Sequence, residues 1–340
     1  MVHVAPNNAN LQQSLLRLNR RAAVLHAVLA IGVLVVTIAK WDTTFKLRLT
    51  QRVYRIDTFS KCHKNCYTDN KVRFENLSLN DRLIRTEHLY QGQKTVFEAP
   101  VGACVGLFAA ITAMFHFMLA YPLRDKYFQW VFTEHRQPAR WIEYSITASI
   151  MTCVVASLCG IQNINVQLGL FMMTAATMLT GAAIERVPGV ASGLSTEQWA
   201  WYVAGCGLFV ATWAVILESY VAIKQFLNED GRSLIDLLRG LFKFPKQVDE
   251  NPQIPDFVTW TTINIVILFA LFAVVALIAQ NVNNWVSRRY AQGSGPTNPK
   301  AFAYATGERQ FVMLSFISKA FLVIMIGSAI MRDDPATYLQ

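Results

Sequence analysis

A single lysine lies inside a long apolar run near the C-terminal end of the chain. Lys319 stands in SFISKAFLV, with apolar or small residues on both sides. A lysine at the centre of a membrane-spanning helix costs about 2.5–3.5 kcal/mol on insertion scales, and this amine is too far from either end of the run to reach water. Its expected chemistry is therefore ion pairing or covalent attachment through a Schiff base.

A buried cation needs an anion beside it, and the apolar runs contain few carboxylates. Glu143 stands near the start of the third run, in RWIEYSITASIM, whereas Glu185 and Glu218 stand near the ends of the fourth and fifth runs. The third and seventh spans should cross the membrane in the same direction. Glu143 and Lys319, each in the first half of its run, then lie at similar depth, and we expect them to pair.

Three more polar residues share helix faces with this pair. Arg140 precedes Glu143 by three positions, and Thr147 follows it by four. Ser315 precedes Lys319 by four positions. Residues three or four apart are neighbours on a helix surface, and polar clusters inside a membrane usually mark a functional site. We therefore expect the five residues to form one polar patch.

Seven apolar runs, each long enough to cross a bilayer, carry these residues. Of the 340 residues, 53% are hydrophobic and 16% are charged, which is typical of a multi-span membrane protein. A span in lipid must satisfy its own backbone hydrogen bonds, so each run should be an α-helix. The sequence thus predicts an all-α membrane protein, a seven-helix bundle formed as one domain by residues 1–340. The expected spans are 22–39, 100–120, 141–160, 166–184, 200–222, 257–280 and 311–331.

The distribution of basic residues predicts the orientation of the bundle. Among the short loops, those on the side of the N-terminus carry more Lys and Arg than those on the other side, including Arg17, Arg20, Arg21, Arg124 and Lys126. Such loops stay in the cytoplasm, so the N-terminus should be cytoplasmic and the C-terminus extracellular. The formal net charge of +9 then indicates contact with the membrane surface, not with nucleic acid. The first span is expected to be a signal anchor.

The first extracellular loop, residues 40–99, is predicted to be a capping subdomain. Its segment TFKLRLT alternates apolar and polar residues, as in a half-exposed strand of a β-hairpin. Cys62 and Cys66 flank a histidine in CHKNC. A disulfide between them is the leading interpretation in an oxidising compartment; a zinc site would need further ligands nearby.

Two of these segments resemble the span signatures of heliorhodopsins, a family of microbial-type retinal rhodopsins. RWIEYSITASIM is similar to their third span, and GERQFVMLSFISKAFLV to their seventh. The inverted topology and the long first loop are also heliorhodopsin features. The resemblance implies that Lys319 binds all-trans retinal as a protonated Schiff base, with Glu143 as its counterion. It further implies a photoreceptor rather than an enzyme, and a homodimer in the plasma membrane or an endomembrane, with its signalling partner unknown.

The resemblance also assigns roles to neighbouring residues. Ser315 occupies the place of the second carboxylate of proton-pumping rhodopsins, and Thr147 that of a hydrogen-bonding hydroxyl. His26 and His116 resemble the buried histidines of a cytoplasmic polar network that could accept a proton. Aromatic residues should line the polyene, and the candidates are Tyr144, Trp213, Phe269 and Phe272.

Several functions are compatible with this pattern. A proton pump is disfavoured because Val154 stands where pumps carry the donor carboxylate, eleven residues after the counterion. A sensory photoreceptor is favoured by the resemblance. The alternative is a light-gated passive proton conductance with Glu185, Glu143 and Glu218 as successive proton sites. A transporter or receptor without retinal, in which the lysine and glutamate form a structural ion pair, is a further alternative.

Overall fold

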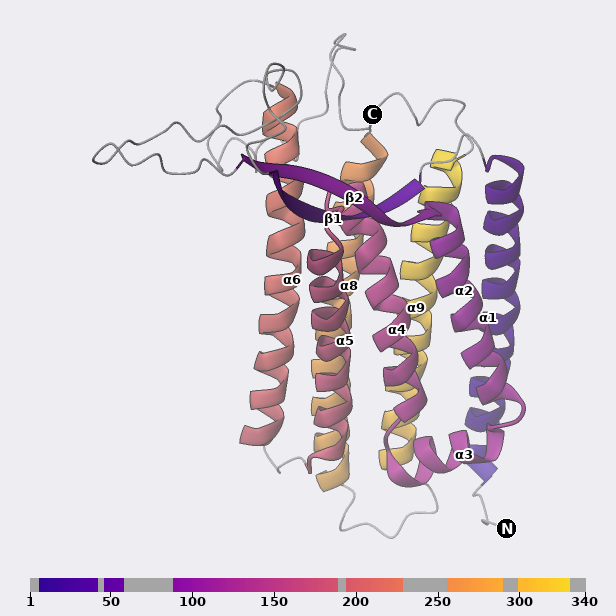
Figure 1. Ribbon diagram of the computed structural model, residues 1–340. Helices are drawn as coiled ribbons and strands as arrows, with labels where there is room; N and C mark the ends of the chain where they lie inside the picture. The colour runs from indigo at the N-terminus through magenta and orange to yellow at the C-terminus, as the bar shows by residue number, and fades with distance from the viewer. Residues whose placement is uncertain are drawn as a thin grey trace, which may run out of the picture.

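Seven long helices stand side by side in the computed structural model, which describes residues 6–41, 46–57, 88–188, 194–228, 256–289 and 299–330 (Figure 1). All seven are long and apolar enough to cross a membrane. Each contains most or all of one predicted span, so the predicted fold class is confirmed. The helices are α1 (Pro6–Ala39), α2 (Val101–Ala120), α4 (Pro138–Leu158), α5 (Ile164–Arg186), α6 (Thr196–Asn228), α8 (Asp256–Arg289) and α9 (Pro299–Ile330).

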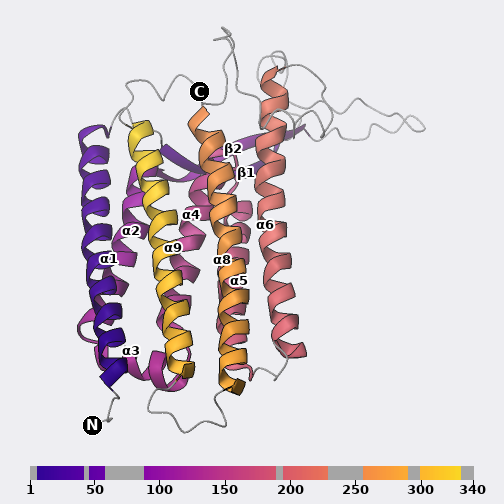
Figure 2. The ribbon, with the colours of Figure 1, turned by 180° about the vertical axis from the view of Figure 1, so that it is seen from behind.

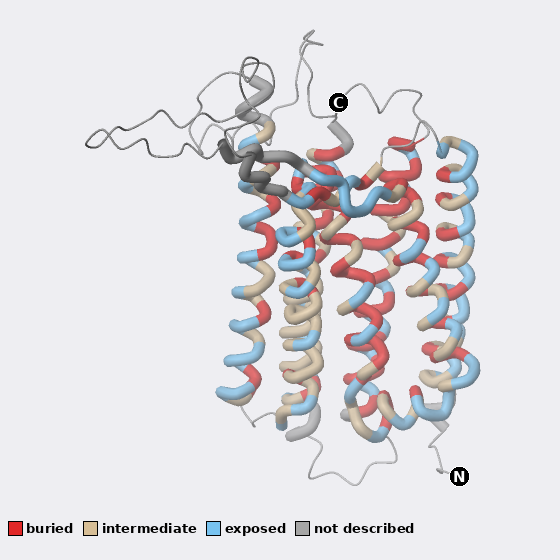
Figure 3. The backbone as a smooth tube through the Cα atoms, in the orientation of Figure 1, coloured by how far each residue is buried: buried red, intermediate tan, exposed pale blue. Residues whose placement is uncertain are grey.

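The outer surface of the bundle is apolar and part of its interior is polar. On α1, for example, Val28, Ile31 and Ile38 are exposed, whereas Asn19 and His26 are completely buried. Figure 3 shows how buried and exposed positions are distributed along the helices. An apolar surface around a partly polar interior is expected when the surrounding solvent is hydrocarbon. The polar side chains that matter for chemistry should therefore be sought between the helices.

A β-hairpin lies across one end of the bundle. Strands β1 (Lys46–Asp57) and β2 (His88–Pro100) pair antiparallel, with a register shift between Leu49 and Thr50. The Thr50 amide donates to the Gln162 carbonyl at 2.7 Å, which ties the hairpin to the α4–α5 connection, and Leu47 is buried in the core. The predicted hairpin between the first two spans is confirmed. Cys62 and Cys66 lie outside the described residues.

The opposite end of the bundle is closed by the connection between α2 and α4 (Figures 1 and 2). It contains the short helix α3 (Arg124–Phe128) and the π-helical turn η2 (Gln129–Glu134). The turn ends at His135, whose φ of 53° is left-handed. Tyr127 and Val131 are fully buried and pack in one hydrophobic cluster with Leu15 of α1. This connection is therefore part of the folded bundle.

Helix α9 begins much earlier than the sequence predicts. The expected seventh span starts at residue 311, but the helix starts at Pro299. The segment GERQ, which looks like a polar boundary in the sequence, is helical, and Glu308 within it is only 2% exposed. Glu308 contacts the guanidinium of Arg140 of α4 inside the bundle. The bundle thus contains a buried carboxylate that the predicted spans omit.

Candidate functional site

The lysine and glutamate predicted to pair are in contact in the interior of the bundle. Lys319 Nζ of α9 donates to Glu143 Oε1 of α4, and the two residues are 3% and 4% exposed. Each charge is isolated from water, so each depends on the other. The amine also lies 5.0 Å from the centre of the Tyr144 ring, one residue after Glu143.

Two hydroxyl groups hold the Glu143 carboxylate in place. Thr147 Oγ1 lies 3.0 Å from Glu143 Oε1, one turn later on α4, as the spacing predicts. Thr112 Oγ1 of α2 donates to the same oxygen at 2.7 Å. Thr112 was not predicted, because a threonine in an apolar helix gives no distinctive signal unless its depth relative to Glu143 is known. Donors from α2, α4 and α9 therefore converge on one carboxylate oxygen.

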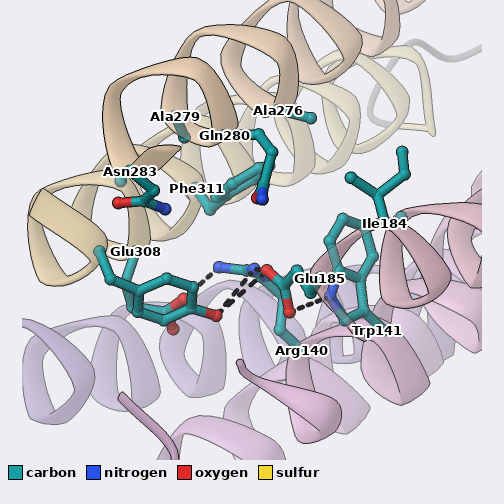
Figure 4. A pocket seen from close by; sticks show the side chains of 13 residues that line it. Arg140, Trp141, Ile184, Glu185, Ala276, Ala279, Gln280, Asn283, Glu308 and Phe311 are labelled. Carbon is teal, nitrogen blue, oxygen red and sulfur yellow. Dashed lines mark hydrogen bonds and ion pairs between the residues drawn. The ribbon is translucent and has the colours of Figure 1, made fainter. Parts of the chain in front are cut away.

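Arg140 belongs to a second charged group and not to the expected five-residue patch. Its Nη1 donates to Glu308 of α9 and its Nη2 to Glu185 of α5 (Figure 4). We call Arg140, Glu185 and Glu308 the Arg140 cluster. The guanidinium also lies over the Phe311 ring, 4.1 Å from its centre. The expectation that Arg140 shares a patch with Glu143 is wrong, because two nearer carboxylates bind its guanidinium.

Glu185 is enclosed by hydrogen-bond donors. In addition to the bond from Arg140, it accepts hydrogen bonds from Trp141 Nε1 at 2.8 Å, from the backbone N–H of Gln137 at 3.1 Å and from the Tyr304 hydroxyl at 3.1 Å. Its side chain is 9% exposed. The sequence places Glu185 beside Arg186 at a helix end, which suggests a hydrated surface residue. The structure instead turns it toward the interior.

An apolar cavity adjoins the aromatic rings around Tyr144. It has a volume of about 270 Å³ between α5, α6 and α8, and its wall includes Phe209, Phe269, Phe272 and Phe311. The Phe272 ring lies 5.5 Å from the Tyr144 ring, and Tyr144 in turn underlies the lysine amine. A continuous set of aromatic rings therefore joins the amine to the cavity. Aromatic walls with few polar groups are typical of sites for apolar ligands.

Two of the four predicted aromatic residues line this cavity, and the other two contact them. Phe269 and Phe272 line the cavity directly. Trp213 lies behind Phe269, with 5.9 Å between their ring centres, and is 3% exposed. Tyr144 lies nearest the lysine, and its hydroxyl donates to the Phe311 carbonyl at 3.1 Å.

The two predicted histidines are also brought together. His26 of α1 and His116 of α2 stack with their ring centres 5.9 Å apart. His116 Nδ1 lies 2.7 Å from Asn19 Oδ1, and Asn19 Nδ2 donates to the Tyr127 hydroxyl of α3 at 3.2 Å. Burial raises the pKa of the Tyr127 phenol well above its usual range, so this group stays neutral. The polar network therefore reaches from the helices to the α2–α4 connection.

The remaining predicted residues differ in their surroundings. Ser315 is completely buried, one turn before Lys319 on α9. Glu218, in contrast, is exposed on α6. It therefore does not join Glu143 and Glu185 in the interior, and the structure does not bring together the three glutamates expected as successive proton sites.

Comparison with known families adds an independent observation. A family model described as Heliorhodopsin matches residues 15–230. The matched range covers more than half of the chain and includes α2, α4 and α5, with Arg140, Glu143 and Glu185. It ends before α8 and α9, so Lys319 lies outside it. A search of curated proteins gives no match.

Proposed function

The chain belongs to the heliorhodopsin family, and we propose that it is a light-absorbing photoreceptor that binds all-trans retinal through Lys319. Family membership implies a retinal-binding rhodopsin, and members are in general photoreceptors without enzymatic activity. The attachment residue and the output of the photoreceptor are our inference. The observation that carries the proposal is the buried Lys319–Glu143 ion pair, which the rings of Tyr144 and Phe272 connect to an apolar cavity.

The residues present fit such a chromophore. Retinal is a long apolar molecule with an aldehyde at one end, so it requires a reactive amine and an apolar enclosure. Lys319 supplies the amine, and Phe269, Phe272 and Phe311 supply rings along the adjoining cavity. Glu143 supplies an anion next to the amine nitrogen, where a positive charge must be stabilised away from water.

The chain's own residues would hold this site in one geometry. When bound, retinal supplies visible-light absorption and a double bond that light isomerises. Glu143 holds the positive charge at the Lys319 nitrogen, and Thr112 and Thr147 fix the Glu143 carboxylate. The Tyr144 ring lies beside the amine, and its hydroxyl is held by the Phe311 carbonyl. A displacement of the lysine nitrogen would break these contacts and move α9 relative to α4.

The side chains in the places of the donor carboxylate and of the second carboxylate of pumps argue for a sensory output and against pumping. Val154 is 1% exposed and Ser315 is completely buried. Neither side chain can supply the carboxyl proton that a pump uses at these positions. Light energy would then be converted into a conformational change that a signalling partner detects. We further infer a cytoplasmic N-terminus, a homodimer, and residence in the plasma membrane or an endomembrane.

The direct test is the colour of the purified protein. With added all-trans retinal, the wild-type chain should develop a visible absorption band. Lys319→Arg keeps the positive charge next to Glu143 but cannot form the bond, so it should stay colourless. Lys126→Ala removes an exposed lysine from α3 and should leave the band unchanged. A visible band in Lys319→Arg would disprove the attachment site.

Light-gated passive proton conductance is the second candidate function. It is favoured by the buried position of Glu143 and Glu185, because carboxylates inside a membrane often mark proton routes. The exposed Glu218 does not support the route first expected from the sequence. In a voltage-clamped cell, illumination should produce a current that reverses near the proton equilibrium potential. A coloured protein without current would exclude proton conductance, and the sensory function would then be the one supported.

A further inference from the structure

The Arg140 cluster has one negative charge too many if both carboxylates are ionised. A single guanidinium contacts Glu185 and Glu308, whose side chains are only 9% and 2% exposed. The same cluster is surrounded by uncharged groups, since α8 presents the amides of Gln280 and Asn283 across from it (Figure 4). An uncompensated charge in such surroundings is very unfavourable, and a carboxylate there takes up a proton instead.

The hydrogen bonds indicate which carboxylate carries the proton. Glu185 accepts hydrogen bonds from Arg140, Trp141, Tyr304 and the Gln137 backbone, and these donors stabilise an ionised carboxylate. Glu308 accepts a hydrogen bond from Arg140 Nη1, and it lies near the side-chain amide of Gln137. Donors favour the charged form of a carboxylate, and Glu308 has fewer of them than Glu185.

Three phenols lie within electrostatic range of Glu308 and do not change this balance. They belong to Tyr127, Tyr144 and Tyr304, on α3, α4 and α9. Neutral phenols add no compensating positive charge. His135, at the end of η2, contacts the Tyr304 ring at 6.2 Å between ring centres.

A small cavity beside the cluster is large enough for one water molecule. Its volume of about 20 Å³ exceeds the roughly 10–15 Å³ that one water molecule needs. Glu308, Gln280 and Arg140 lie in its wall. Arg140 Nε is buried and, within the described part of the chain, has no hydrogen-bond acceptor. A buried donor without an acceptor beside a cavity of this size points to a bound water molecule.

We propose that the Arg140 cluster is a proton-binding site in which Glu308 carries a proton at neutral pH, next to one water molecule. This site lies toward the end of the bundle where α3 closes it, and it is separate from the Lys319–Glu143 pair. The two sites are adjacent, because Arg140 lies over Phe311 and Phe311 accepts a hydrogen bond from Tyr144. Proton binding does not require retinal; a role in light-driven proton movement rests on the proposed function.

Infrared spectroscopy of the full-length protein in lipid nanodiscs tests this site, with and without retinal. In the dark at neutral pH, wild type should show the C=O band of a protonated carboxyl group, and deuterated water should shift it. Glu308→Gln should lose the band. Glu218→Gln, the same substitution at an exposed position, should keep it. Absence of the band in wild type, or its survival in Glu308→Gln, would overturn the proposal.

Thermal unfolding distinguishes Glu308 from Glu185 as the proton carrier. Glutamine resembles a protonated carboxyl group, so Glu308→Gln should melt at the wild-type temperature. Glu185→Gln should melt at a lower temperature than wild type. Trp141 Nε1, the Tyr304 hydroxyl and the backbone N–H of Gln137 would each lose a charged acceptor. The reverse order, or failure of Glu308→Gln to fold, would show that Glu308 is the ionised partner and that the assignment is wrong.

Discussion

The Lys319–Glu143 pair and the Arg140 cluster are two buried charged groups that share helices α4 and α9. The first contains one cation and one anion and is balanced. The second places one cation between two carboxylates, so its charges are not balanced. They therefore suit different tasks. A balanced pair holds a fixed charge beside a chromophore, whereas an unbalanced cluster must bind a proton. Substitutions that neutralise one glutamate at a time should separate the two groups.

The largest effect is expected in the balanced pair. Glu143→Gln leaves the Lys319 amine buried without an anion, and removal of one partner from a buried ion pair costs about 3–5 kcal/mol. Thermal or denaturant unfolding of the retinal-free protein measures this loss. The double variant Glu143→Gln, Lys319→Met removes both charges and should recover most of the stability. A single variant as stable as wild type would mean that the pair is not buried as described.

The hydroxyl group from α2 should have the next largest effect. Thr112→Val keeps the side-chain shape but removes a hydrogen bond to a carboxylate, which is worth about 1.5–3 kcal/mol. Thr147→Val is the matched control on α4. Its hydroxyl also lies 2.9 Å from the backbone carbonyl of Glu143, which is the usual hydrogen bond between a threonine and the preceding turn of its own helix. We expect Thr112→Val to lower the free energy of unfolding more than Thr147→Val does. Equal effects would argue against a special role for the α2 contact.

The two carboxylates of the Arg140 cluster should respond unequally. Glu185→Gln removes the charged acceptor of several donors and should cost about 1–3 kcal/mol, as expected for buried polar groups left with poor partners. Glu308→Gln should cost less than about 1 kcal/mol, because the replaced group is already neutral. Equilibrium unfolding of both variants in the same lipid measures the difference. Equal costs would imply that the two carboxylates share the proton.

The smallest effect is expected at the exposed glutamate. Glu218→Gln changes a side chain on the surface of α6, and such substitutions usually alter stability by less than about 0.5 kcal/mol. If light produces a proton current, this variant should retain it, in contrast to Glu143→Gln. Loss of current in Glu218→Gln alone would restore the route first expected from the sequence.

The sequence predicts the pair well because spacing on a helix determines which residues share a face. The depth of Lys319 and Glu143 within their spans follows from counting residues along helices that cross the bilayer in the same direction. The seven helices follow for a similar reason, because hydrocarbon permits few other structures. The alternation in TFKLRLT likewise predicts a strand that the structure contains.

The Arg140 cluster could not be found in the same way. A polar segment before an apolar run looks like a loop, so Glu308 falls outside the predicted seventh span although α9 includes it. The partner of Arg140 depends on which helices are neighbours, and local spacing favoured Glu143 instead. The side of α6 on which Glu218 lies, and the inward turn of Glu185, likewise depend on helix rotation, which the apolar runs alone do not specify.

The attachment of retinal to Lys319 can be tested by locating the chromophore on the chain. The coloured protein would be reduced with borohydride to fix the bond between amine and chromophore, then digested and analysed by mass spectrometry. We expect a retinyl mass on the peptide that contains Lys319. A retinyl group on another lysine, or on none, would contradict it.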